Sequence, residues 1–169
     1  MIIRIICVLV EAIILYILQT SVFTGIALAG VVPDLLLILV VAVAFMRGRI
    51  PAMFTGFFCG ILIDCCYSST IGLFALMYLI IGYLTGFAHR IYDENDYTLP
   101  LILTGGAELI YNLIYYLIFY LLSGKLNIGF YLVRFMIPKI IYTVLISVVL
   151  YKLLNACNIF LMRFDRDNV

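Results

Sequence analysis

Six long segments of nearly unbroken apolar residues make up most of this chain, and short polar stretches separate them. A helix needs about 20 apolar residues to cross the hydrocarbon core of a bilayer. Hydrophobic residues make up 67% and charged residues 11% of the sequence, whereas a soluble domain has roughly 45–50% and about 25%. The chain therefore has too little polar surface to fold in water, and the segments predict a bundle of transmembrane helices. The expected spans are about 3–22, 33–46, 50–66, 70–89, 98–122 and 131–155.

The loops between these segments are too short to hold a soluble domain, so residues 1–169 are expected to form a single integral membrane domain, all-α and multi-pass. The first segment resembles a signal peptide, but Glu11 interrupts it and it is long for that role, so a retained span is expected. Lys and Arg gather on one side of the spans, and only Lys125 lies in a loop on the other side. Basic loops face the cytoplasm. Both termini are therefore expected in the cytoplasm, and residues 23–32, 67–69 and 123–130 on the outer side of the membrane.

No pattern of catalytic residues stands out in the sequence. Its net charge of +1 gives no basic field for nucleic acid, and it has no phosphate-binding glycine loop and no metal-spaced His/Cys cluster. We expect no enzymatic activity, no cofactor and no metal. The five cysteines are expected to be small apolar packing residues, and the alternative is a lipidated or reactive pair at Cys65–Cys66.

Two stripes of small residues run along neighbouring spans at helical spacing. In lipid, small residues allow helix backbones to approach closely. Such a stripe packs either against another helix of the same chain or against a helix of a partner protein. We hypothesise that the stripe of span three packs against a helix of a partner protein, which also satisfies the hydrogen-bonding groups of Asp64. The stripe of span three is Ala52, Gly56, Gly60 and Asp64, and that of span four is Gly72, Ala75, Leu79, Gly82 and Gly86.

Several ionisable residues fall inside the expected spans, where such residues are costly and are usually paired or functional. Structural pairing that fixes helix register is favoured over a proton or solute path and over contact with a partner. Asp34, Asp64 and Arg134 lie near the outer span ends, which predicts a cluster. The full set is Glu11, Asp34, Asp64, Glu108, Arg134 and Lys139.

The remaining intramembrane charges are placed by counting residues from the span ends. Glu11 and Glu108 are expected at similar depth in the inner half of the membrane, and Lys139 near its middle. A Glu108–Lys139 ion pair then requires that span five be tilted, or broken at Gly105–Gly106. Asn112, Tyr115 and Tyr116 extend a polar stripe from Glu108, which either lines a cavity or, as we favour, makes hydrogen bonds between helices.

Five short motifs occur in a characteristic order within the first half of the chain. P-D-L-L-L begins at Pro33, and it is followed by R-G-R at 47–49, G-F-F-C-G-I-L-I-D at 56–64, G-L-F-A-L at 72–76 and G-Y-L-T-G at 82–86. In order and spacing these motifs resemble the MreD family of rod-shape-determining membrane proteins. The second half of the chain adds little to the resemblance.

The resemblance implies a non-enzymatic scaffold in the bacterial cytoplasmic (inner) membrane. Members associate with the periplasmic protein MreC, and with other membrane proteins of the elongation machinery, to organise peptidoglycan synthesis and maintain cell shape. The family fold is similar to the S components of energy-coupling-factor transporters.

That similarity makes a substrate-binding S component of a vitamin or small-solute uptake transporter the alternative function. S components dock through small residues spaced by four in the first span, but here Ala12 is followed by Tyr16. This departure favours the scaffold. An ion or proton transporter is less favoured, because no span is broken by paired Gly/Pro in matching halves.

Overall fold

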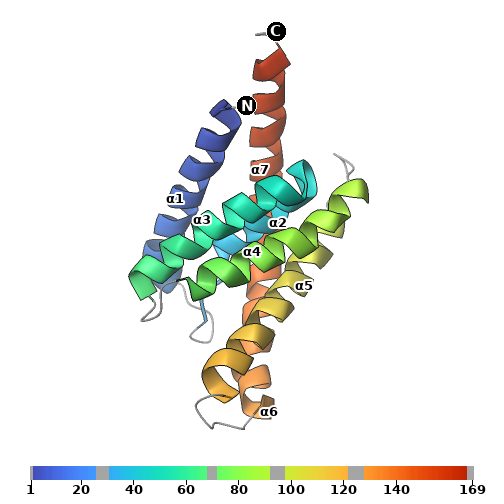
Figure 1. Cartoon of the computed structure of the whole chain (residues 1–169). Helices are drawn as coiled ribbons and strands as arrows, with labels where there is room; N and C mark the ends of the chain where they lie inside the picture. Colours follow the sequence, from blue (N-terminus) through green and yellow to red (C-terminus); the bar gives the residue numbers. More distant parts are fainter. Residues whose placement is uncertain (1, 26–30, 68–71, 92–97, 122–127, 167–169) are drawn as a thin grey trace.

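The computed structural model describes residues 2–25, 31–67, 72–91, 98–121 and 128–166, and its regular elements are helices (Figure 1). Three short elements of other helical types join the longer ones: the 3₁₀ helix η1 and the π-helical segments η2 and η3. In chain order the elements are α1 (Ile2–Gly25), α2 (Leu35–Arg47), α3 (Arg49–Tyr67), α4 (Leu73–Thr85), η1 (Gly86–Ile91), α5 (Thr98–Tyr115), η2 (Tyr116–Leu121), α6 (Ile128–Tyr131), η3 (Leu132–Met136) and α7 (Ile137–Arg166).

These elements form six continuous helical segments close to the expected ones. Helix α4 runs into η1, α5 runs into η2, and α6 continues through η3 into α7. The largest difference is at the end of the chain, where α7 continues to Arg166 instead of ending near residue 155. The π-helical turns were not predicted, because the sequence carries no Pro or Gly at either turn to mark the change.

Four of the described helical stretches are long and apolar enough to cross a membrane: Ile5–Phe23, Leu73–Arg90, Thr98–Ile118 and Leu132–Ile159. Helix α2 is a different kind of element. Its 13 residues extend only about 20 Å at 1.5 Å per residue, against a hydrocarbon core of about 30 Å. The expectation that this segment spans the membrane by itself is therefore wrong.

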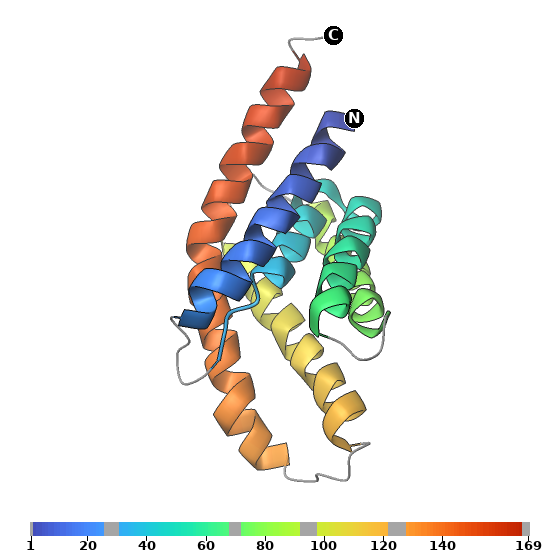
Figure 2. The same cartoon turned by 90° about the vertical axis from the view of Figure 1, so that its left-hand side faces the viewer.

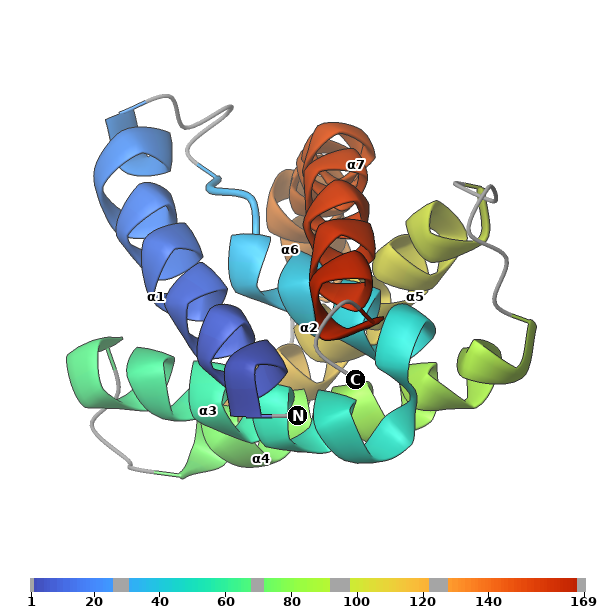
Figure 3. The same ribbon diagram turned by 90° about the horizontal axis from the view of Figure 1, so that it is seen from above.

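Helix α2 instead forms the centre of the protein. Twelve of its 13 residues are buried, and it contacts α1, α3, α4, α5, α7 and η1 (Figure 3). Such burial explains why its sequence is apolar on every side, since a helix that is hydrophobic all round has no polar medium to face. The paired helices α3 and α4 cross one side of the bundle obliquely to α7 (Figure 1). At the opposite end from the termini, the hairpin of α5–η2 and α6–η3–α7 projects beyond the other helices (Figure 2).

The start of α1 and the end of α7 lie at the same end of the molecule (Figure 2). Basic side chains gather there. Arg47 Nε donates to Asn158 Oδ1 of α7 at 3.1 Å, and the Arg49 guanidinium lies 3.6 Å from the Phe87 ring centroid. His89 Nδ1 lies 2.7 Å from the Phe45 carbonyl oxygen and caps the end of α2, so this ring does more than face solvent. This arrangement agrees with the prediction that both termini lie on the same side of the membrane. That this side faces the cytoplasm remains a prediction.

Helices α3 and α4 pack so closely that glycine is required at the contacts. A Cβ atom on Gly56 would lie 2.4 Å from the Tyr78 carbonyl oxygen, and one on Gly60 would lie 2.3 Å from the Ala75 Cα. The same holds in the other direction, where a Cβ on Gly82 would lie 2.6 Å from the carbonyl oxygen of Ala52. A Cβ on Gly86 would meet the Arg49 Cα, also at 2.6 Å. These four glycines form one antiparallel ladder, which we call the α3–α4 glycine ladder.

Asp64 completes this ladder at the start of α4. Its Oδ1 accepts from the Phe74 backbone N–H at 3.3 Å and its Oδ2 accepts from that of Ala75 at 3.0 Å. The first N–H groups of a helix have no partner within the helix, and a buried carboxylate satisfies them here. The hypothesis that this face of α3 meets a helix of another protein is therefore wrong: α4 of the same chain occupies it.

Gly72 has a different role from the ladder glycines. A Cβ placed on it meets no atom within 4 Å, so it makes no close helix contact. It is the residue before α4 and has φ 103°, a left-handed conformation that glycine adopts without steric cost. Its expected role in helix packing is wrong, and its role is to let the chain turn into α4.

Candidate functional site: a buried charge network beside an aromatic cavity

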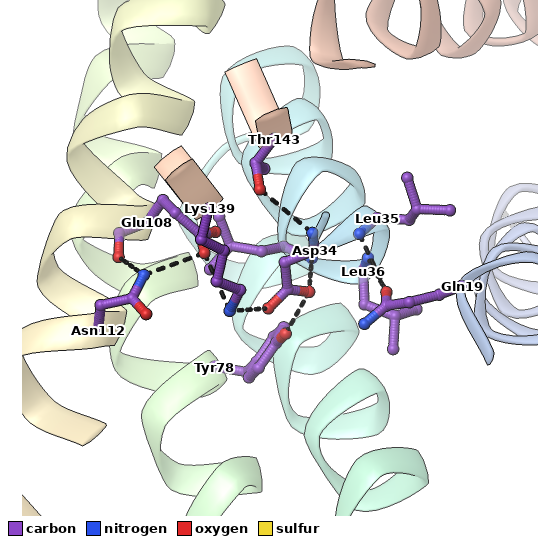
Figure 4. A network of polar contacts seen from close by, with 10 residues as sticks. Gln19, Asp34, Leu35, Leu36, Tyr78, Glu108, Asn112, Lys139 and Thr143 are labelled. Carbon is purple, nitrogen blue, oxygen red and sulfur yellow. Dashed lines mark hydrogen bonds and ion pairs between the residues drawn. The ribbon is translucent and has the colours of Figure 1, made fainter. Parts of the chain in front are cut away.

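Asp34 joins three helices at the beginning of α2. As the N-cap residue it accepts from the Leu37 backbone N–H at 3.2 Å, and the same Oδ1 accepts a 2.6 Å hydrogen bond from the Tyr78 hydroxyl of α4. Its Oδ2 lies 3.6 Å from Lys139 Nζ of α7. The Asp34 backbone N–H donates to Thr143 Oγ1 at 3.2 Å, which adds a second link to α7 (Figure 4). Pro33, just before it, is buried as well.

Gln19 of α1 satisfies the next two backbone donors of α2. Its Oε1 accepts from the N–H groups of Leu35 at 3.0 Å and Leu36 at 3.3 Å (Figure 4). With Asp34 Oδ1 bonded to the Leu37 N–H and Thr143 Oγ1 to the Asp34 N–H, all four N–H groups that the start of a helix leaves without internal partners are bonded to side chains. Gln19 was not among the predicted site residues, although an amide side chain inside an apolar segment indicates a buried hydrogen-bonding role.

Lys139 is the positive centre of the network. Its Nζ lies 3.0 Å from Glu108 Oε1 of α5 and 4.5 Å from the centroid of the Tyr111 ring. Asn112 Nδ2 donates to the Glu108 carbonyl oxygen at 2.8 Å and to its Oε1 at 3.1 Å. The Glu108–Lys139 ion pair, which the sequence left open, is present. Helix α5 is inclined relative to α7 (Figure 2) and continues unbroken through Gly105–Gly106.

The network holds two carboxylates and one ammonium in the protein interior. The side chains of Glu108 and Asp34 are 0% and 4% exposed, and that of Lys139 is 19% exposed. Glu108 Oε2 has no hydrogen-bond partner among the described residues. Breaking such a buried pair is costly, because the charge left behind is neither solvated nor neutralised. The network therefore ties α2, α4, α5 and α7 into one arrangement.

The other predicted polar residues do not join this network. Asp64 caps α4, and Arg134 lies exposed on η3, so the predicted cluster of Asp34, Asp64 and Arg134 is wrong. The π-helical turn accounts for the exposure of the Arg134 side chain. Hydrogen bonds from i to i+5 rotate side chains away from the helix face that regular α-helical spacing predicts.

Glu11 is also misplaced in the prediction. Its carboxylate accepts from the Cys157 thiol, and Cys157 lies roughly 27 Å along α7 from Lys139 at 1.5 Å per residue. Glu11 is therefore near the end of the molecule that holds the termini, and the expectation that it shares a depth with Glu108 is wrong.

A cavity of about 430 Å³ lies next to the network, between α5 and the segment from α6 to the start of α7. Lys139 and Asn112 line it together with aromatic side chains from α4, α5, α6 and η3. The hydrogen bonds of Asn112 to Glu108 lie within α5 and do not join two helices. Asn112 and Tyr115 line the cavity, which was the less favoured expectation, and the Tyr116 ring packs 5.2 Å from that of Tyr131.

The arrangement offers structural linkage and a binding cavity. The described residues include no group of three or more His, Cys, Asp or Glu side chains placed to hold a metal ion. A helical bundle with several apolar helices long enough to cross a membrane, joined by a buried charge network, is typical of an integral membrane protein.

One family model matches, that of the rod shape-determining protein MreD, and it covers residues 1–162. The chain belongs to the MreD family. No curated protein and no solved structure matches the chain, so the similarity to transporter S components remains a prediction.

Proposed function

We propose that this protein is a non-enzymatic scaffold of the bacterial cell-elongation machinery, located in the cytoplasmic membrane. In this role it associates with an MreC-like periplasmic protein and helps to organise peptidoglycan synthesis. The observation that carries the proposal is the family match over residues 1–162, because rod-shape determination is the role of that family.

The architecture supports a scaffold that binds its partners through outer surfaces. The α3–α4 glycine ladder and the charge network hold the interior together, so neither is available to another protein. By contrast, only 17% of an 18-residue apolar segment within Ile5–Phe23, and the same share of one within Leu132–Ile159, is buried. In a membrane these apolar faces contact either lipid or partner helices, and partner contact is expected among them.

Affinity purification in mild detergent tests the proposal. The tagged protein is expressed in a rod-shaped bacterium depleted of its own family member, and photo-crosslinking residues replace exposed Ile13 of α1 or Val149 of α7, with buried Val40 as the control position. We expect restored rod shape, recovery of an MreC-like protein, and crosslinks from an exposed position but not from Val40. Normal expression with spherical cells and no such partner would contradict the proposal.

The aromatic cavity is the observation that favours the alternative of solute capture for uptake. Such a protein must dock to a coupling subunit and an ATPase pair in order to release its cargo. The same purification separates the two functions, because recovery of an ABC-type ATPase pair in place of an MreC-like protein would support uptake.

A further inference from the structure

Two groups of aromatic rings form part of the cavity lining, and Val31, Val32 and Ile63 form an aliphatic part of it. On the side of α4 and α5, the Tyr115 ring lies 6.1 Å from that of Phe74 with an interplanar angle of 28°, and 6.3 Å from that of Tyr111 with an angle of 25°. On the other side, the Tyr131 and Phe135 rings are 5.9 Å apart with an angle of 30°. Rings arranged in this way present flat faces and edges to a ligand, and aromatic groups favour offset stacking or edge-to-face contact with such surfaces.

Polar groups lie at one part of the lining. Asn112 and Lys139 both line the cavity, and the Lys139 side chain is 19% exposed, against 4% for Asp34 and 0% for Glu108. An ammonium has three N–H donors and no acceptor. Both hydrogens of Asn112 Nδ2 are donated to Glu108, so the donor that a ligand meets is Lys139, and the ligand must supply an acceptor to it.

The charges of the network argue against an ionic ligand of either sign. A cation would approach the Lys139 ammonium directly. An anion would approach an ammonium that already pairs with two carboxyl groups, at 3.0 Å and 3.6 Å. An uncharged ligand with an acceptor oxygen avoids both costs, since placing an uncompensated charge in a poorly solvated site is unfavourable.

From these features we infer that the cavity is a binding site for an uncharged, planar ring compound with a carbonyl or similar acceptor at one edge. The ring lies between the two aromatic groups, and the acceptor faces Lys139. The cavity volume of about 430 Å³ falls in the range of small-molecule sites, about 300–1,000 Å³. A flexible acyl chain would leave the Lys139 donor unused. The site is independent of the scaffold role and requires no transport.

The inference is tested with 7-methoxycoumarin, an uncharged planar probe with a ring carbonyl. The probe is titrated into the full-length protein in lipid nanodiscs, and binding is followed by the change in its fluorescence relative to empty nanodiscs. The key variant is Phe135→Ala, which removes one ring from a position that is 40% exposed and so leaves the core intact. The matched control is Val133→Ala on the same π-helical turn, 66% exposed and outside the lining.

We expect saturable binding to the wild type and to Val133→Ala, and a dissociation constant about three- to tenfold higher for Phe135→Ala, the range that one aromatic contact gives. An anionic coumarin carboxylate and the aliphatic 1-decanol should compete weakly. The inference is overturned if wild type and Phe135→Ala bind alike, if neither binds above empty nanodiscs, or if 1-decanol displaces the probe as well as an uncharged ring does. Tighter binding of the carboxylate would overturn the uncharged class in favour of an anionic one.

Discussion

Replacing Gly60 by alanine adds one methyl group at a place where two helix backbones touch. The new Cβ would lie 2.3 Å from the Ala75 Cα, 2.5 Å from its backbone nitrogen and 2.6 Å from the Phe74 carbonyl oxygen. Because all three atoms belong to the backbone, no side chain can rotate away. Ordinary contact begins at 3.4 Å, so α3 and α4 must separate locally by about 1.1 Å, the difference between 3.4 and 2.3 Å.

That separation also lengthens the hydrogen bonds of Asp64. The Ala75 N–H to Oδ2 distance of 3.0 Å would rise to about 4 Å, which is beyond hydrogen-bonding range. Overpacking costs about 1–3 kcal/mol and loss of a helix cap about 1 kcal/mol, while alanine in place of glycine returns up to about 1 kcal/mol of helix propensity. The expected net loss of stability is about 1–3 kcal/mol.

Gly106→Ala is the matched control, because a Cβ at Gly106 of α5 meets no atom within 4 Å. This variant should be as stable as the wild type or more stable by up to about 1 kcal/mol. Reversible unfolding in mixed detergent micelles, followed by circular dichroism, gives both values. Equal stability of Gly60→Ala and Gly106→Ala would refute the close backbone contact on which the reasoning depends.

Three further predictions follow from the network and the topology. Lys139→Met should lower the free energy of unfolding by about 3–5 kcal/mol, because it leaves buried carboxylates unpaired. Adding Glu108→Gln should restore part of this loss, and a double variant less stable than Lys139→Met would count against the ion pair. Gln19→Leu removes the acceptor for two buried N–H groups of α2 and should cost about 1–3 kcal/mol in the same unfolding assay, whereas an unchanged value would mean that water replaces the amide. A membrane-impermeant thiol reagent added to whole cells that express a variant without native cysteines should label Lys125→Cys and spare Asp93→Cys, and the reverse pattern would invert the topology.

The sequence allowed the helices to be predicted more fully than their contacts. Apolar length marks a membrane helix almost without regard to its neighbours, which is why the helical segments were found close to their true bounds. The stripe containing Gly56 and Gly60 also correctly indicated close approach to a helix. It could not identify that helix, because a small-residue face is equally suited to α4 and to a helix of another protein.

The candidate site was predicted in part, for a related reason. A Glu108–Lys139 pair was left open by the sequence and not predicted, although opposite charges inside a membrane have few other ways to be satisfied, and the structure contains this pair. Asp34 was expected beside Arg134, but the π-helical turn places Arg134 on the surface, and Tyr78, Thr143 and Lys139 surround Asp34 instead. Counting at regular helical spacing assumes an α-helix throughout and therefore cannot anticipate such a turn.

The burial of α2 has a consequence for how the protein is made in the membrane. Its polar groups are satisfied by Gln19 of α1, His89 of η1 and Thr143 of α7, so its environment is complete only when the last helix has been synthesised. A chain that stops before α7 would lack Thr143 and Lys139, the two partners of Asp34 on that helix. Packing of the centre therefore cannot be completed before the last helix has been made.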